Sequence, residues 1–152
     1  MLHTNQKDNL FVFAQFSLFV IFWLDPEFKY FNFPSVLQYP GLLMSLTGLV
    51  ICGVSILQLN KNLTAFPTPK ESARLYSGGL YQYIRHPIYT GVIMIFAGLS
   101  LYFGSLFKLL ITLMLIILFF FKAAYEEVQL SKKFPEYEQY KSKTGKFLPV
   151  FK

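Results

Sequence analysis

The sequence is short of charged residues. Only 14% of its 152 residues are Asp, Glu, Lys or Arg, against about 25% in a typical soluble protein. Hydrophobic residues make up 54% of the chain and aromatic residues 19%. A chain of this length is expected to form one domain, and this composition favours a lipid environment. We therefore predict a single membrane domain over residues 1–152, with the lipid bilayer as its partner.

Residue types for metal or redox chemistry are also scarce. Cys52 is the only cysteine, so no intrachain disulfide is possible. The two histidines, His3 and His86, lie far apart in the sequence and do not have metal-ligand spacing. No Walker, G-x-S-x-G or G-x-G-x-x-G element follows a strand-like segment. We therefore expect no metal site and no Rossmann-type cofactor site.

Acidic residues are outnumbered by basic ones, 8 to 14, which gives a formal net charge of +6. Such a charge raises the question of nucleic-acid binding, but the lysines are scattered and the aromatic residues lie in apolar runs rather than in a stacking platform. We expect no nucleic-acid partner. Basic loops that face anionic lipid are the better interpretation.

Long apolar runs are what the sequence has in abundance. Four stand out, at residues 10–24, 39–59, 87–102 and 106–124. At about 1.5 Å per residue, the second and fourth reach roughly 28–32 Å, which matches a hydrocarbon core of about 30 Å. The first and third are shorter and need flanking residues or a locally thinner bilayer. The sequence predicts an all-α integral membrane protein with about four transmembrane helices, the last two joined as a hairpin by Phe103-Gly104-Ser105.

The basic residues predict an orientation. With four spans, Lys29 and Lys108 lie on one side of the membrane, and the other twelve of the 14 lysine and arginine residues lie on the opposite side. The positive-inside rule then places both termini and the loop 60–86 in the cytoplasm. We expect an integral protein of the cell's inner membrane, and the sequence leaves its oligomeric state open.

The second run carries a face of small residues. Gly41, Ser45, Gly48, Cys52 and Ser55 follow one another at steps of four and three. Small residues at this spacing let two helices approach closely in lipid. We interpret this face as a packing surface.

The last segment, residues 125–152, is polar and is expected to be cytoplasmic. We predict a short interfacial helix within it that begins at Pro135 and is capped by Gly145. Phe134, Tyr137 and Tyr140 share one face of such a helix, which would place the tyrosines at headgroup level. A solvated basic tail is the alternative.

Two groups of polar residues stand beside the apolar runs. Pro87 suits the first turn of a helix, so Arg85 and His86 would lie at its positive end, where anions bind. Lys122, Glu126 and Glu127 follow the fourth run, and the hairpin would bring them to the same interface. The alternatives are an interfacial anchor with a helix cap for the first group, and an i,i+4 pair for Lys122 and Glu126.

The stretches "GGLYQYIRHPIYTGV" and "EEVQLSKKFPEYEQYKSKTGKFLPVF" resemble the isoprenylcysteine carboxyl methyltransferase family and its relatives, the phospholipid N-methyltransferases. The resemblance covers about residues 64–150. It implies an integral membrane enzyme that transfers a methyl group from S-adenosylmethionine to a lipophilic small-molecule acceptor. By position, the cofactor-binding residues would be Tyr81, His86, Pro87, Tyr89, Gly91 and Glu126. The resemblance also implies that Glu127 and Lys122 face the methyl acceptor, and Arg85 is the third residue expected to take part in catalysis.

One departure bears on the substrate. Lys122 occupies a position where the family usually has arginine, and a lysine cannot form the bidentate fork that arginine offers a carboxylate. This disfavours a prenylcysteine carboxylate and leaves amine, thiol and other carboxylate acceptors open. Two other functions remain as alternatives. One is an NADPH-dependent sterol or steroid-type reductase, whose similar motif has asparagine where this chain has Ile88, and the other is a non-catalytic membrane scaffold.

Overall fold

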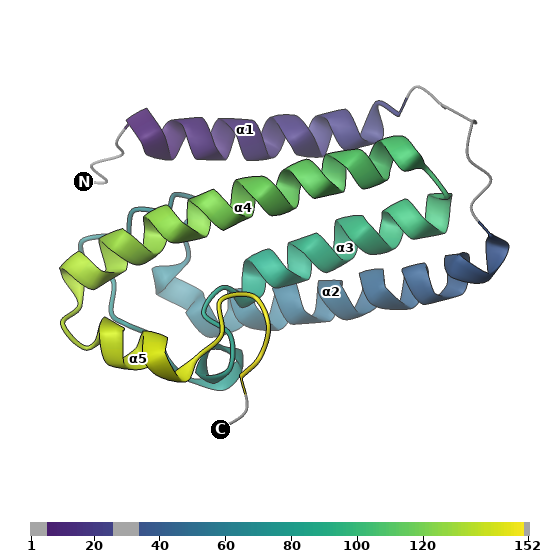
Figure 1. The fold of residues 1–152 in the computed structure, drawn as a ribbon. Helices are drawn as coiled ribbons and strands as arrows, with labels where there is room; N and C mark the ends of the chain where they lie inside the picture. Colours follow the sequence, from purple (N-terminus) through teal and green to yellow (C-terminus); the bar gives the residue numbers. More distant parts are fainter. Residues whose placement is uncertain (1–5, 26–33, 151–152) are drawn as a thin grey trace.

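The computed structural model describes residues 6–25 and 34–150, with only the backbone of Lys61. Within these ranges the chain is helical and has no strand, which confirms the all-α class. The helices are α1 (Gln6–Trp23), α2 (Gln38–Leu59), α3 (Pro87–Phe103), α4 (Leu106–Lys133) and α5 (Tyr137–Lys143), with short 3₁₀ turns at Ser35–Leu37, Asn60–Asn62 and Gly79–Gln82. The four long helices lie side by side in the order α1, α4, α3, α2, and α5 lies across one end (Figure 1).

Two of the described helices are long and apolar enough to cross a membrane, namely Ser35–Leu59, which contains α2, and α4. Helix α3 is apolar but shorter. The outer face of α2 leaves large apolar side chains uncovered, with Tyr39 82% and Leu57 79% exposed. Such faces are stable when lipid covers them, which supports a membrane environment. The arrangement with four spans stays a prediction.

The hairpin between α3 and α4 is confirmed. Gly104 ends α3 with a φ of 61°, a left-handed conformation that glycine adopts without a steric penalty. The next residue, Ser105, caps α4, because its hydroxyl accepts a hydrogen bond from the Lys108 backbone N–H at 3.2 Å. The turn therefore makes α3 and α4 antiparallel and returns the end of α4 to the start of α3.

The small-residue face of α2 packs against α3, as the sequence predicts. A Cβ atom added at Gly48 would lie 2.6 Å from the Gly91 carbonyl oxygen, and one added at Gly41 would lie 2.7 Å from the Gly98 carbonyl oxygen. Neither position has room for a side chain, and both distances are shorter than van der Waals contact. Glycines on the two helices therefore set how closely α2 approaches α3.

Gly48→Ala is expected to destabilise the protein by about 1–3 kcal/mol, because the added methyl group must push α3 away. Gly53→Ala is the matched control on the same helix, since a Cβ there meets nothing within 4 Å. This control should be neutral or slightly stabilising. Thermal unfolding of both variants in detergent checks the prediction, and equal midpoints would contradict the close helix contact.

Helix α1 is fixed to the hairpin at the end away from α5. Lys108 is only 7% exposed, and its ammonium donates to the Phe22 carbonyl at 2.8 Å and lies 3.4 Å from the Asp25 carboxylate. The Phe19 and Phe22 rings contact the Phe96 ring at centroid distances of 4.8 and 4.7 Å. These contacts hold α1 against α3 and α4. They therefore also fix the position of the start of α1, at the end of the bundle that carries α5.

The C-terminal segment differs from its prediction. Helix α4 continues past the apolar run to Lys133, because nothing breaks it before Phe134-Pro135 and two lysines suit its negative end. Helix α5 begins at Tyr137, so Pro135 is not its first residue. Gly145 is not its cap either, because the helix ends at Lys143. Gly145 instead accepts a hydrogen bond from the Arg85 N–H at 2.8 Å, which draws this segment beside residues 83–86.

The aromatic face of α5 also differs from its prediction, because it points inward. Tyr137 is only 1% exposed, and both Tyr140 and Phe134 line an internal cavity. The tyrosines therefore do not lie on an outer surface at headgroup level.

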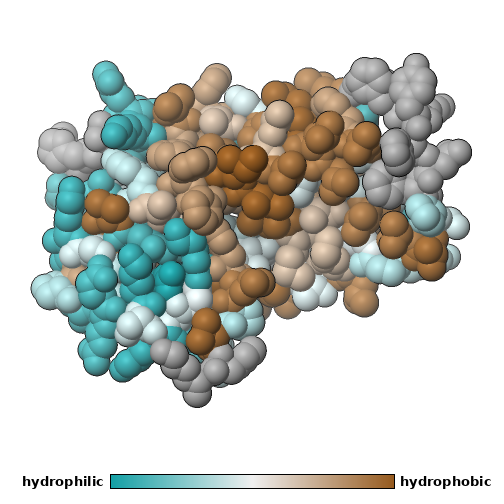
Figure 2. All heavy atoms as spheres, viewed as in Figure 1, coloured by the Kyte–Doolittle hydropathy of each residue, from teal (hydrophilic) through white to brown (hydrophobic). Residues whose placement is uncertain are grey.

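Most polar residues of the visible face gather at the end of the molecule that carries α5, and apolar residues cover most of its middle (Figure 2). The start of α1 lies at this same end (Figure 1). A membrane protein with one polar end is consistent with a site at the interface. Lys29 and Lys152, which enter the count of basic residues, lie outside the described residues, so the orientation stays a prediction.

Candidate active site

A cavity of about 340 Å³ lies at the polar end of the bundle. This volume is within the usual range for small-molecule sites. Its wall combines residues of α2, α3, α4 and α5, the loop between α2 and α3, and one residue of α1. Most of the lining is apolar, and the polar residues among it include Gln15, Asn62, Thr64, Arg85, His86, Lys122 and Glu126.

The first turn of α3 places a stack of rings in this cavity. His86 precedes Pro87, the first residue of α3, and its ring is stacked on Tyr89 at 5.3 Å with an interplanar angle of 5°. Tyr89 in turn is stacked on Phe119 of α4 at 4.7 Å. The stack therefore joins the start of α3 to the middle of α4 and fixes the orientation of the Tyr89 ring between His86 and Phe119.

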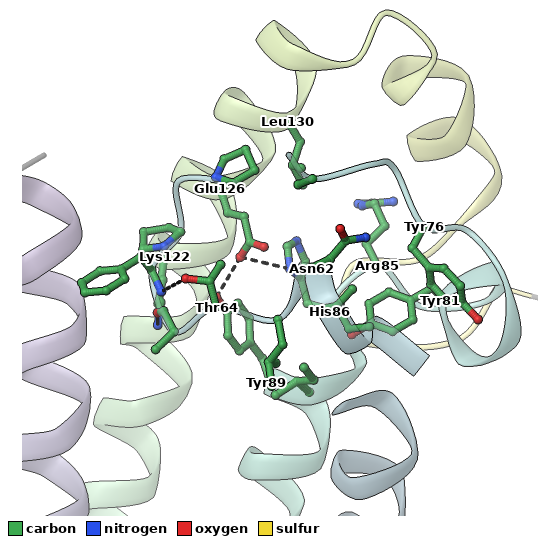
Figure 3. A pocket seen from close by; sticks show the side chains of 18 of the residues that line it. Asn62, Thr64, Tyr76, Tyr81, Arg85, His86, Tyr89, Lys122, Glu126 and Leu130 are labelled. Atoms are coloured by element: carbon green, nitrogen blue, oxygen red, sulfur yellow. Dashed lines mark hydrogen bonds and ion pairs between the residues drawn. The ribbon is translucent and has the colours of Figure 1, made fainter. Parts of the chain in front are cut away.

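Glu126 is the carboxylate of the cavity. It accepts a hydrogen bond from the Tyr89 hydroxyl at 2.7 Å, and its carboxylate lies 3.7 Å from His86 Nδ1. Its side chain is 26% exposed, so one part of the carboxylate stays accessible. Figure 3 shows Glu126 near the middle of the cavity, with Lys122 on the side of α1 and Arg85 and Tyr81 on the opposite side.

Glu127 lies outside this cavity and is almost fully enclosed. Its side chain is 6% exposed and lies 3.0 Å from Arg85 Nε, 3.3 Å from His86 Nε2 and 3.5 Å from Lys141 Nζ. It faces a second, more open groove between α4 and α5. The side chains of the two adjacent acids, Glu126 and Glu127, therefore point to different sites. The basic groups around Glu127 favour its ionised form.

Arg85 holds the C-terminal segment in place. Its side chain donates to Glu127 at 3.0 Å, to the Lys141 carbonyl at 2.9 Å and to the Thr144 carbonyl. Its backbone N–H donates to Gly145. Although Arg85 also lines the cavity, most of its donors are therefore engaged with protein groups.

Lys122 is buried in the cavity wall, with 1% exposure. Its ammonium donates to Gln15 Oε1 at 2.6 Å and to the Ala65 carbonyl at 2.9 Å, and lies 5.3 Å from the centre of the Tyr89 ring. The described part of the chain contains no acid within 4.0 Å of this ammonium, so an i,i+4 pair with Glu126 does not form. Lys122 instead joins α4 to α1 and to the loop.

Tyr81 and Tyr140, which also line the cavity, remain neutral hydrogen-bond donors. Tyr140 donates to the Tyr81 carbonyl at 2.7 Å, and the Tyr81 hydroxyl lies 3.5 Å from the Ser55 carbonyl. Burial, with a smaller contribution from nearby Glu126, raises the pKa of Tyr81 well above its ordinary value. Burial also raises the pKa of Tyr140 to about 12. Both hydroxyls therefore keep their protons at neutral pH.

Pro87 and Gly91 lie behind the cavity rather than on its wall. Pro87 is buried at the start of α3. A Cβ at Gly91 would lie 2.8 Å from the Gly48 carbonyl oxygen and from Cys52 Cβ, so Gly91 faces α2. Of the predicted site residues, the cavity therefore brings together these six: Tyr81, Arg85, His86, Tyr89, Lys122 and Glu126.

Sequence reasoning missed the polar residues on two parts of the wall. One is the loop 62–76, which Asn62 closes by pairing with the backbone of Arg74 at 2.9 and 3.3 Å. The other is Gln15 of α1. Its signal was present, because a side-chain amide inside the first apolar run is expensive in lipid unless it has a partner.

The fold and the cavity define a class of protein: an all-helical protein with membrane-length helices and a small-molecule site at its polar end. The model of the phospholipid methyltransferase family matches residues 37–137, more than half of the chain. The chain therefore belongs to the phospholipid methyltransferase family. No curated protein matches the sequence. The family implies a methyltransferase that acts on a membrane substrate and favours this function over the reductase.

Proposed function

We propose that the protein transfers a methyl group from S-adenosylmethionine to a lipophilic acceptor at the cytoplasmic face of the membrane. The observation that carries this proposal is the combination of His86, Tyr89 and Glu126 in one cavity, with two stacked rings and a carboxylate that remains 26% exposed. With this assignment, the polar end of the bundle and both termini lie on the cytoplasmic side of the inner membrane.

The residues present fit this cofactor. A sulfonium cation is stabilised by aromatic rings and by a nearby carboxylate, and the cavity wall supplies several aromatic residues and Glu126 for this purpose. A ribose diol needs a hydrogen-bond acceptor, which the exposed part of Glu126 provides. The buried Tyr81 and the ring of His86 complete the binding wall.

When bound, S-adenosylmethionine supplies an electrophilic methyl group. The task of the protein is then alignment, because in-line displacement depends on how the acceptor is held. Glu126 orients the cofactor side, and Lys122 lies at the acceptor side next to α1. Exclusion of water by the apolar wall strengthens each of these polar contacts.

We assign Glu127 a positioning role rather than direct contact with the acceptor. It holds both Arg85 and His86, at 3.0 and 3.3 Å, from outside the cavity. Arg85 acts in the same way, by tying the C-terminal segment to the start of α3. Their contribution to catalysis is then to fix the His86 ring. A displacement of about 1 Å in the geometry of a site can lower the rate a hundredfold.

Calorimetry on the purified protein in detergent tests this proposal. We expect S-adenosylhomocysteine, the demethylated product, to bind at micromolar levels, and NADPH to bind at least a hundredfold more weakly. The Glu126 carboxylate can accept hydrogen bonds from the ribose diol of S-adenosylhomocysteine, while it repels the phosphate groups of NADPH. Binding of NADPH without binding of S-adenosylhomocysteine would overturn the proposal in favour of the reductase.

A further inference from the structure

The loop 62–76 forms one side of the cavity, at the polar end of the bundle. The Asn62 side chain pairs with the backbone of Arg74 at 2.9 and 3.3 Å, which draws the two ends of the loop together. Tyr76, at the last position of the loop, contacts the Tyr81 ring edge to face with a centroid distance of 5.5 Å. The loop is therefore folded back on itself and lies against residues of the site.

Helix α4 carries a row of side chains that leads to this loop. The residues of the row follow one another at steps of four, four and three, so they share one face of the helix: Lys122, Glu126, Leu130 and Lys133. The first three line the cavity (Figure 3). Lys133 is the last residue of α4 and does not belong to the cavity wall. It therefore lies at the rim of the cavity, beyond Leu130.

Two lysines of this row hold the loop by its backbone carbonyls. Lys122, which is 1% exposed, donates to the Ala65 carbonyl at 2.9 Å. Lys133 donates to the Lys70 carbonyl and, at 2.9 Å, to the Glu71 carbonyl. The bond from Lys133 to Glu71 is exposed to water, so it breaks more readily than the enclosed bond of Lys122. Lys133 is therefore the outer attachment of the loop.

The loop is the part of the wall that can move with the least loss of packing. Helices supply most of the remaining wall, and α2 and α3 are in contact through Gly48 and Gly91. Separating these helices would expose packed apolar surface, whereas side-chain hydrogen bonds attach the loop to α4. Segments with such attachments open at a low cost in free energy, and lids of this kind often set the rate of ligand exchange.

We propose that the loop 62–76 is a lid over the cavity and that Lys133 is the positioning residue that holds it closed. Because Lys133 lies outside the cavity wall, it stabilises the closed lid equally whether the cavity is empty or occupied. Its function is then to set the rate at which the cofactor enters and the demethylated product leaves. The identity of the ligand rests on the proposed function, but the motion of the lid is measurable without a ligand.

The association and dissociation rates of S-adenosylhomocysteine test the proposal, measured by surface plasmon resonance on the full-length protein in an uncharged detergent. Lys133→Ala removes both hydrogen bonds from this side chain to the lid. We expect both rates to rise about tenfold, as for loss of a hydrogen bond from a charged donor. The dissociation constant should stay within about threefold of the wild type, because the closed lid is weakened equally with and without the ligand.

Lys132→Ala is the matched control, because Lys132 is exposed in the same turn of α4 and lines the second groove. It should leave both rates unchanged. Lys133→Arg retains a charged donor for the same carbonyls and should keep both rates within about threefold of the wild type. Faster exchange of the ligand in Lys132→Ala and Lys133→Ala alike would indicate a general effect of charge and would overturn the proposal.

Hydrogen exchange is the readout that needs no ligand. The Ala73 and Arg74 amides donate within the loop, to the Lys70 carbonyl and to Asn62 Oδ1. Because Lys133 holds the same Lys70 carbonyl, its removal lets this turn open. Exchange of the two amides should be about tenfold faster in Lys133→Ala than in the wild type, with no change in α3.

Unchanged association and dissociation rates in Lys133→Ala would overturn the proposal. Faster dissociation with unchanged association would also overturn it, because this result indicates that Lys133 stabilises only the occupied cavity. If S-adenosylhomocysteine does not bind the wild type, the proposed function is contradicted, and hydrogen exchange alone then decides whether Lys133 holds the lid.

Discussion

Glu126→Gln is expected to lower the affinity for S-adenosylhomocysteine by at least about thirtyfold, which corresponds to about 2 kcal/mol. The physical reason is that a carboxylate accepts stronger hydrogen bonds from a ribose diol than an amide oxygen does. The amide can still accept from the Tyr89 hydroxyl, so the 2.7 Å contact with Tyr89 and the fold should be retained. Calorimetry in detergent measures the affinity.

Glu136→Gln is the control for this change, since Glu136 is exposed and its side chain makes no capping hydrogen bond. It should leave the affinity within about twofold of the wild type. If Glu126→Gln also binds within twofold of the wild type, Glu126 does not contact the cofactor. The assignment of this cavity as the cofactor site would then be wrong.

Glu127→Ala is expected to have the largest effect on stability. Removing the carboxylate leaves Arg85, whose side chain is 10% exposed, without an ion-pair partner. It also leaves His86, whose side chain is 4% exposed, with only Glu126 as a nearby carboxylate. Breaking a buried ion pair from one side costs about 3–5 kcal/mol. Since Arg85 also bonds the Lys141 and Thr144 carbonyls, the C-terminal segment should detach before the helices unfold.

Limited trypsin digestion and thermal unfolding in detergent distinguish this local effect from a general one. Limited trypsin digestion should cleave at Lys141 or Lys143 much faster in Glu127→Ala than in the wild type, because α5 is no longer held. Glu127→Gln keeps an acceptor for the Arg85 donor and should lose less stability. Glu136→Ala should behave as the wild type in both assays. Equal cleavage rates in Glu127→Ala and the wild type would show that Glu127 does not anchor the segment.

The helices and their hairpin follow from the sequence because apolar runs, Pro87 and Gly104 act locally. Each predicted run begins and ends within a few residues of its helix, except that α4 continues to Lys133. The meeting of Arg85-His86 with Glu126-Glu127 also follows, because a tight turn joins two helices of known direction. The small-residue face of α2 is confirmed for the same reason, as its spacing needs only one helix to be recognised.

The rest depends on tertiary packing that no local pattern encodes. Helical spacing cannot say that Glu126 faces the cavity and Glu127 the C-terminal segment, since the choice depends on where α5 docks. Nor does it place Gln15 against Lys122, because the two are far apart in the sequence and meet only after α1 packs on α4. The inward face of α5 depends on Arg85, which donates to the Lys141 carbonyl in α5 and to the Thr144 carbonyl just after it.

The most direct test of the central claim is transfer of labelled methyl from S-adenosylmethionine by the purified protein to total membrane lipids. We predict label in the lipid extract with the wild type and with Glu136→Gln, and at least a thirtyfold lower rate with Glu126→Gln at subsaturating cofactor. No labelled lipid from a wild-type preparation that binds the cofactor would contradict methyl transfer to a lipid acceptor. An undiminished rate with Glu126→Gln would contradict the assignment of this cavity as the site.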